Sequence, residues 1–362
     1  MKTEVLQNPQ TKTRTVYLDY LRVLATFAVI VIHTCAECWR TGEALSYNWN
    51  ILTIYESLVR WCVPIFVMIS GALFLNPQKE TGLKQLFTKN IFRLISSFLF
   101  WSFCHSLIDH RKNLLTPSVL FQTVEGYFHL WFVPMIAGVY LLIPFLKEII
   151  KKEKLTKYFL LLFAVFAVII PQTFTFIFDC IGIDTISSLV SPFKKVINYL
   201  NVNFVSGYVG VFILGYFVNN IKLSQKQRTI IYIGGAIGFI TTFIGTVFVS
   251  TRLSKPAGYF FDYLTINVML ESVAVFVFFK HLFEKIKISE RINSFVAKLS
   301  KYSFGIYLCH ILVLKVTAKI GLTAVSFNPI FAVPVTALFV FTVSCIISAI
   351  IHKIPILKKY IV

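Results

Sequence analysis

Residues 17–35 read YLDYLRVLATFAVIVIHTC, and this stretch decides the class of fold. As a helix rising 1.5 Å per residue, its 19 residues extend about 28 Å, close to the thickness of a bilayer core. It carries Asp19, Arg22 and His33 and lacks a convincing small-residue cleavage site, which argues against a secretory signal peptide. We therefore predict a membrane-spanning helix here.

Nine more apolar segments of similar length follow along the 362-residue chain. They are residues 51–75, 91–109, 131–146, 158–178, 204–221, 229–249, 264–283, 302–320 and 330–351. Only 14% of the residues are charged, against about 25% in a soluble chain. The sequence predicts an all-α polytopic membrane protein of about ten transmembrane helices. We expect one membrane domain over 17–351, between an N-terminal segment 1–16 and a C-terminal tail 352–362.

The basic residues indicate how the chain is oriented. Lys and Arg number 35 against 16 Asp and Glu, which gives a net charge of +19. With ten spans, 23 of the basic residues fall on the side of the N-terminus and 8 on the other. The positive-inside rule then predicts that both termini are cytoplasmic. The lipid bilayer is the expected partner, and no nucleic acid is needed to explain the charge.

Charged side chains are costly inside a bilayer, so those of the first span are candidates for function. At 100° per residue, Arg22 and His33 differ by about 20° around the helix, and Asp19 lies within about 60° of both. Along the axis, about 16 Å separates Arg22 from His33. An alternative is structural, with Asp19 pairing with Arg22 at a helix end and His33 bonding a neighbouring helix.

Two other spans carry arginines. Arg93 begins the third span, where it either snorkels to the interface or faces an anionic ligand. Glu56 and Arg60 are four residues apart in the second span, a spacing that favours an ion pair within one helix. We interpret that pair as structural.

Five further residues are candidates for binding a substrate. Glu125, His129 and Trp131 cluster where the fourth span begins, and an interfacial aromatic belt explains Trp131 equally well. Glu271 and His310 lie near mid-membrane, where each either lines a cavity or forms a hydrogen bond between helices.

Several familiar chemistries find no support in the sequence. His33, Cys35 and Cys38 resemble a fragment of a metal site, but no second ligand pair accompanies them, so we predict no metal. The seven cysteines define no disulfide framework. GxxxxGK[ST], GxGxxG and GxSxG motifs are absent, which disfavours ATP-driven transport and a soluble-type serine hydrolase.

Five stretches carry a family resemblance. They are LDYLRVLATFAVIVIHT from Leu18, VPIFVMISGALFL from Val63, RLISSFLFWS from Arg93, HLWFVPMIAGVYLLIPFL from His129 and SFGIYLCHILV from Ser303. In this order and spacing, the chain resembles the acyltransferase type 3 family of integral-membrane proteins. It is most similar to the O-acetyltransferases of bacterial surface polysaccharides, such as that of enterobacterial common antigen. The R-x10-H pattern of the family falls on Arg22 and His33.

The resemblance implies an O-acyltransferase of the bacterial cytoplasmic (inner) membrane that moves acetyl from cytoplasmic acetyl-CoA to a hydroxyl of a surface or lipid-linked glycan. His33 would be the catalytic base or acyl carrier, supported by Asp19, which fixes Arg22. Arg22 and Arg93 would bind the phosphates of coenzyme A. Many members carry an additional extracytoplasmic domain, so this chain either works alone or hands its acyl group to a separate extracytoplasmic transferase.

Two other functions stay open from the sequence. Ten spans with mid-membrane Glu271 and His310 also fit a transporter or flippase for a polar metabolite or a lipid-linked sugar. A sensing or scaffold domain with a degenerate site is the third possibility.

Overall fold

The computed structural model describes residues 16–78, 82–109, 117–176 and 207–362, which form helices and no strand. Eight helices are long and apolar enough to span a membrane. They are Val16–Thr41, Tyr47–Phe74, Leu83–Asp109, Glu153–Phe174, Gln225–Leu253, Tyr259–Lys285, Glu290–Lys319 and Pro329–Ile351. The bent pair Phe128–Leu141 and Ile143–Ile150 is either a broken ninth span or a re-entrant loop, and Tyr208–Asn220 is a shorter apolar helix. Each of the ten predicted segments thus contains a helix, and the predicted all-α polytopic class is confirmed.

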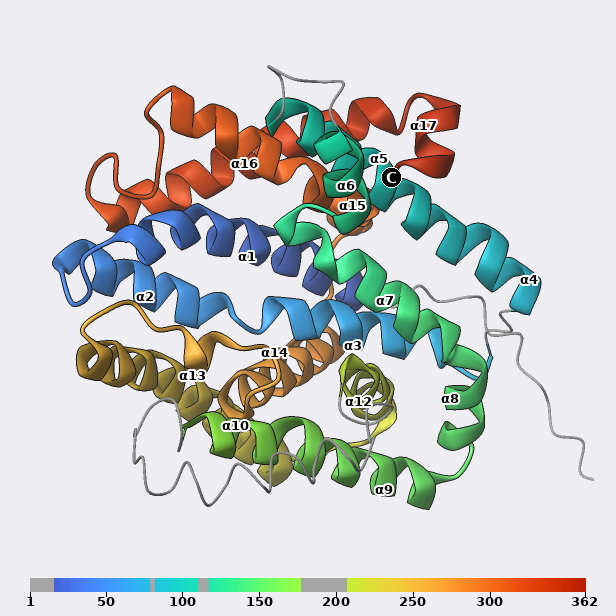
Figure 1. The fold of residues 1–362 in the computed structure, drawn as a ribbon. Helices are drawn as coiled ribbons and strands as arrows, with labels where there is room; N and C mark the ends of the chain where they lie inside the picture. Colours follow the sequence, from blue (N-terminus) through green and yellow to red (C-terminus); the bar gives the residue numbers. More distant parts are fainter. Residues whose placement is uncertain (1–15, 79–81, 110–116, 177–206) are drawn as a thin grey trace, which may run out of the picture.

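Most spans are interrupted and so carry several labels in Figure 1. The first five spans contain α1 (Val16–Thr41), α2 (Tyr47–Val59), α3 (Cys62–Phe74), α4 (Leu83–Gln85), η1 (Leu86–Ile91), α5 (Phe92–Asp109), η2 (Phe128–Trp131), α7 (Phe132–Leu141), α8 (Ile143–Ile150), α9 (Glu153–Phe163), η3 (Ala164–Ile169) and α10 (Ile170–Thr175). The remaining helices are α6 (Pro117–Glu125), α12 (Tyr208–Asn220), α13 (Gln225–Leu253), η6 (Tyr259–Phe261), α14 (Ile266–Lys285), α15 (Glu290–Lys319), α16 (Pro329–Ile351) and α17 (Pro355–Tyr360).

Prolines accompany three of the interruptions. Pro64 has no N–H for the carbonyl four residues earlier, that of Arg60, and the helix breaks there between α2 and α3. Pro144 follows the junction of α7 and α8, which are bent by 58°. Pro171 is the second residue after the π-helix η3, and a second π-helix, η1, precedes α5. Such π segments are frequent near functional sites.

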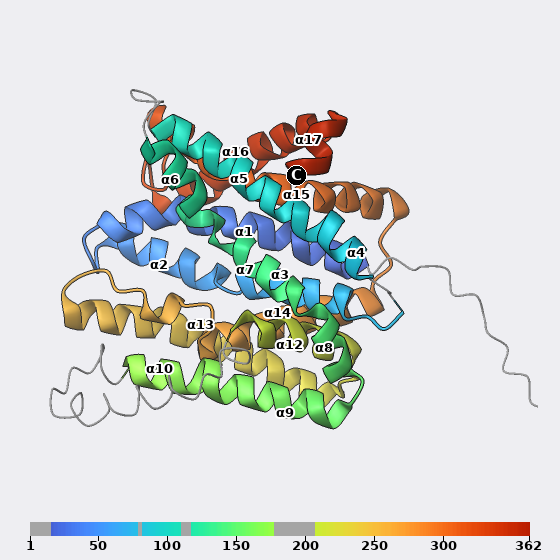
Figure 2. The same ribbon diagram turned by 45° about the vertical axis from the view of Figure 1, so that its right-hand side comes forward.

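The helices are stacked in layers around α1. Figures 1 and 2 show α5, α15 and α16 above α1, the α2–α3 span directly below it, α12, α13 and α14 below that span, and α9–η3–α10 at the bottom. Helix α1 contacts α2, α3, α14, α15 and α16, so its side chains meet several elements at once. Close approach is possible where α3 crosses α12, because a Cβ on Gly71 would lie 1.7 Å from the Phe212 carbonyl oxygen.

The chain passes back and forth between two ends of the molecule. The start of α4, the α8–α9 turn and α17 lie at one end, and the α1–α2 turn lies at the other (Figure 1). We call the first the basic end, because it carries Lys84, Lys89, Lys151, Lys152 and Lys358. Which end faces the cytoplasm stays a prediction.

The C-terminal residues fold back on the bundle. Ser96 of α5 donates a 2.5 Å hydrogen bond to the carbonyl oxygen of Tyr360, and Trp101 Nε1 donates one of 3.1 Å to that of Ile361. The end of the predicted tail 352–362 is therefore packed against α5.

Candidate active site

Four histidines from four elements meet inside the bundle. They are His33 of α1, His105 of α5, His129 of η2 and His310 of α15. Ring centroids are 5.1 Å apart for His33 and His310, 5.2 Å for His129 and His310, 4.9 Å for His105 and His129, and 6.2 Å for His33 and His129. We call this group the histidine cluster. The sequence marked three of its members one by one, whereas it missed His105.

The parallel packing of α1 and α15 brings His33 to His310. Near the start of both helices, Arg22 donates a 3.4 Å hydrogen bond to Ser300 Oγ. His33 is eleven residues after Arg22 in α1, and His310 is ten residues after Ser300 in α15, so the two histidine rings meet. Arg22 and His33 thus both face α15, as the helical periodicity predicted for their shared face.

Most ring nitrogens of the cluster have no hydrogen-bond partner among the described residues. His310 Nδ1 lies 2.6 Å from the Tyr307 carbonyl oxygen. A carbonyl only accepts, so Nδ1 carries the hydrogen and Nε2 of the neutral ring keeps a free lone pair. That Nε2 is unpaired, and in the described part of the chain the buried rings of His105 and His129 have only the Leu308 carbonyl oxygen near them, so each of these three side chains keeps at least one unpaired nitrogen. Buried polar atoms are rarely left so, which marks the cluster as a functional site.

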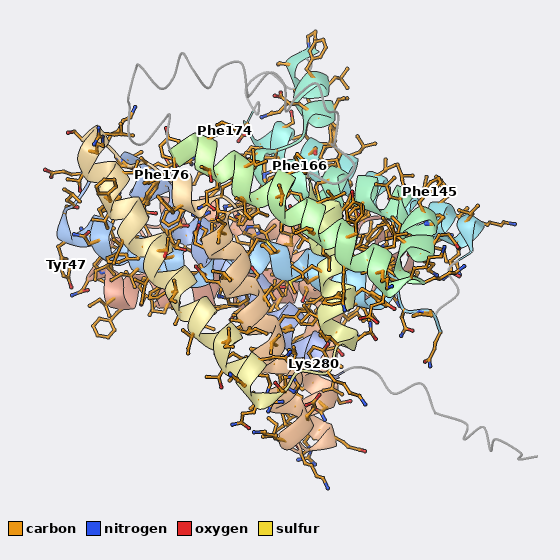
Figure 3. The ribbon with its side chains drawn as sticks, turned by 90° about the horizontal axis from the view of Figure 1, so that it is seen from below. Tyr47, Phe145, Phe166, Phe174, Phe176 and Lys280 are labelled. Carbon is orange, nitrogen blue, oxygen red and sulfur yellow. The ribbon has the colours of Figure 1, made fainter. Side chains whose placement is uncertain are left out.

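His33 is less buried than its neighbours because it faces a cavity of about 1420 Å³. Elements α1, α2, η3, α10 and α15 and the segment around η6 enclose it. Its aromatic lining includes Tyr127, Phe128, Phe166, Phe176, Phe261 and Tyr263. Figure 3 shows Phe166 and Phe176 along the α9–η3–α10 span, at the underside of the molecule. The volume exceeds the ~300–1,000 Å³ of typical small-ligand pockets, so the cavity has room for a large ligand.

The cavity also contains the Glu56–Arg60 pair. Arg60 donates a hydrogen bond to Glu56, and the two side chains are only 12% and 1% exposed. The predicted intrahelical ion pair is confirmed. What the sequence did not indicate is that both residues line the cavity of His33.

Arg22 and Arg93 approach one face of α15 toward the basic end. Ser300 Oγ donates a 2.6 Å hydrogen bond to Asp19 Oδ1 and accepts one from Arg22. The Arg93 guanidinium carbon lies 5.7 Å from the centroid of the Phe304 ring, one helical turn after Ser300. The two guanidiniums therefore reach the same stretch of α15 from α1 and α5.

The structure separates Glu125 and Trp131 from His129. Glu125 is exposed at the end of α6 and does not line the cavity. The Trp131 ring stacks on Tyr263 with centroids 6.0 Å apart, so it supports the cavity wall from behind.

Glu271 lies outside the histidine cluster, in a hydrogen-bonded network between α13 and α14. Thr242 donates a 2.6 Å hydrogen bond to Glu271 and accepts one of 2.8 Å from Asn267 Nδ2. Glu271 lines a second, smaller cavity of about 350 Å³. Glu271 and His310, which the transporter hypothesis grouped, thus belong to separate polar clusters.

Within the described ranges, no group of three or more His, Cys, Asp or Glu side chains has an arrangement that could hold a metal ion. No curated protein and no solved structure matches the chain. The sequence model of the acyltransferase 3 family, described as an acyltransferase domain, matches residues 15–352, which is nearly the whole chain. The chain belongs to this family and is a membrane acyltransferase.

Proposed function

We propose that the protein transfers acetyl from acetyl-CoA to a hydroxyl of a lipid-linked or exported glycan, with His33 as the general base. The observation that carries the proposal is that His33 faces a large cavity and also belongs to a cluster of buried histidines with unpaired nitrogens. The positive charge of the basic end supports a bacterial cytoplasmic membrane location with acetyl-CoA arriving from the cytoplasm.

The chemistry assigned to His33 is a single proton shuttle. Its imidazole takes the proton of the acceptor hydroxyl while that oxygen attacks the carbonyl carbon of the thioester. The new C–O bond forms, the C–S bond breaks, and the thiolate of coenzyme A takes the proton from His33. An imidazole suits this exchange because it gains and loses a proton near neutral pH.

His310 is the positioning residue for His33 in this scheme. Its free Nε2 lone pair can accept the N–H of the neighbouring His33 ring, which leaves the other His33 nitrogen for the acceptor hydroxyl. A hydrogen bond of this kind also stabilises the transient imidazolium of His33.

Arg22 and Arg93 are assigned to the donor. Guanidinium groups bind phosphate bidentately, and the charges of both arginines also act on Tyr140 of α7 nearby. Asp19 holds Arg22 through Ser300 and lies about 21 Å along α1 from His33, so its role here is positioning. The pantetheine arm of acetyl-CoA would bridge the roughly 16 Å of helix between Arg22 and His33.

The aromatic cavity is assigned to the acceptor. Flat aromatic faces suit the apolar faces of sugar rings, and the volume suits more than one sugar. A separate extracytoplasmic transferase that receives the acetyl group from this protein would use the same cavity opening.

The test uses the full-length protein in nanodiscs with acetyl-CoA labelled in the acetyl group, and with a sugar hydroxyl or water as the acyl acceptor. Wild type should release coenzyme A, and His33→Ala should lower the rate by about 10²–10⁴-fold, the usual contribution of a general base. The matched control is His281→Ala, because His281 pairs with Glu284 away from the cavity. An unchanged rate in His33→Ala would refute the mechanism. Label retained on wild-type protein but absent from His33→Ala would show that His33 carries the acetyl group covalently.

The acceptor is identified separately. Mass spectrometry of surface glycans from cells with and without the intact gene should show a difference of one acetyl unit. Identical glycans in both strains would contradict a glycan acceptor.

A further inference from the structure

The Glu56–Arg60 pair is placed for binding a ligand. Glu56 lies on α2 and Arg60 caps the C-terminal end of that helix, and both residues line the cavity that His33 faces. The charge of Arg60 also acts on His33. A ligand that touches the pair is therefore close to the residue assigned to catalysis.

Arg60 is held rigidly from the side opposite Glu56. Its guanidinium carbon lies 4.2 Å from the centroid of the Phe261 ring and 5.9 Å from that of Tyr263. One terminal nitrogen also donates a 3.5 Å hydrogen bond to the Phe261 carbonyl oxygen. The Tyr263 ring is supported in turn by Trp131. The pair is thus preorganised, so a ligand need not order it on binding.

The pair leaves one acceptor and one donor unused. Glu56 Oε1 and Arg60 Nε are buried and have no hydrogen-bond partner in the part of the chain that the structure describes. Buried groups of this kind are expected to be satisfied by a ligand or water. Because the ion pair is neutral as a whole, it favours a neutral ligand that offers a donor to Glu56 and an acceptor to Arg60.

Two neighbouring hydroxyls of a sugar ring have this pattern, since each hydroxyl both donates and accepts. A carboxylate or phosphate would bind Arg60 but meet the negative charge of Glu56, and an ammonium group would meet Arg60. The rings of Phe261 and Tyr263 beside Arg60 add an apolar surface for the sugar.

We propose that Glu56 and Arg60 form the acceptor subsite, which binds two neighbouring hydroxyls of an uncharged sugar and directs a third hydroxyl to His33. The subsite determines the charge class of the acceptor. This proposal rests on the acyl transfer proposed for His33.

The experiment compares two probes as acceptors for labelled acetyl-CoA, methyl β-glucoside and methyl β-glucuronide, which share hydroxyls 2, 3 and 4 and differ at C6, where the carboxylate replaces CH2OH; acetylation is scored at the shared hydroxyls. Wild type should acetylate the neutral glucoside in preference to the glucuronide. Glu56→Gln leaves the Arg60 charge uncompensated. It should raise KM for the glucoside by about tenfold, the loss expected for one charge-assisted hydrogen bond, and reverse the preference toward the glucuronide.

Two variants keep this test interpretable. The double variant Glu56→Gln with Arg60→Gln has no net charge, so it should prefer the neutral sugar again even if affinity is lower. Glu148→Gln removes an exposed ion pair with Lys151 outside the cavity and should leave both KM values unchanged.

The possible failures are distinguishable. An unchanged preference in Glu56→Gln, or a wild type that prefers the glucuronide, would overturn the subsite alone. The same holds if wild type releases coenzyme A in a His33-dependent way but acetylates neither sugar. If wild type shows no His33-dependent release at all, the proposed function fails and the subsite with it.

Discussion

The histidine cluster and the Glu271 network are both buried polar groups within transmembrane helices, yet their polar atoms are used differently. In the network, hydrogen bonds of 2.6–3.0 Å join Glu271, Thr242, Asn267 and Gln172 across α10, α13 and α14. In the cluster, His105, His129 and His310 keep unpaired ring nitrogens, and His33 opens onto the large cavity.

This difference indicates which buried polar groups hold helices together and which serve a ligand. Hydrogen bonds between helices stabilise a membrane bundle when each partner is satisfied within the protein. Polar atoms without a hydrogen bond beside a cavity lower the stability of the fold. Proteins retain this loss of stability at sites of binding and catalysis. Glu271 and His310 are equivalent candidates in the sequence, whereas their hydrogen bonds assign them to different roles.

The largest effect is expected at His310, inside the unsatisfied cluster. His310→Phe keeps a ring of similar size but removes the lone pair assigned to His33. We expect kcat to fall by about 100-fold, as when a catalytic group loses its orientation, while KM for acetyl-CoA stays unchanged. His310→Gln places an amide oxygen near the position of Nε2 and should recover a large part of the rate. If His310→Phe keeps the wild-type kcat, His310 serves only to fill space.

A smaller effect is expected at Arg22 and Arg93. Arg22 is intermediate between the satisfied Glu271 network and the unsatisfied histidine cluster, because it forms a hydrogen bond within the protein and still carries its charge. Loss of either phosphate contact in Arg22→Gln or Arg93→Gln should raise KM for acetyl-CoA by about tenfold. S-acetylpantetheine lacks the phosphates, so its KM should not change in either variant. An equal increase for both donors would show that the arginines support the fold and do not bind phosphate.

The sequence predicts those properties of the molecule that depend on a single stretch of chain. Span positions depend on length and hydropathy, which the sequence displays directly, and all ten segments contain helices. The shared face of Arg22 and His33 was also predictable, because it depends on one helix alone.

The composition of the site depends on packing between distant segments, which periodicity does not give. His105 stands in an apolar span, and that signal could have marked it as a candidate. Its contact with His129, however, requires α5 to approach η2. Likewise, the i,i+4 spacing predicted the pairing of Glu56 with Arg60 but not the cavity beside them.

The smallest effect on activity is expected at Glu271, in the satisfied network. Glu271→Leu removes the carboxylate that accepts from Thr242 and leaves that hydroxyl only the Gly238 carbonyl oxygen, so it should lower the melting temperature while kcat and both KM values stay unchanged. A double-mutant cycle with Thr242→Val should give a coupling of about 0.6–1.7 kcal/mol, the range of such bonds between membrane helices. Loss of activity in a stably folded Glu271→Leu would break the distinction between the two polar groups, because a satisfied network would then also take part in the reaction.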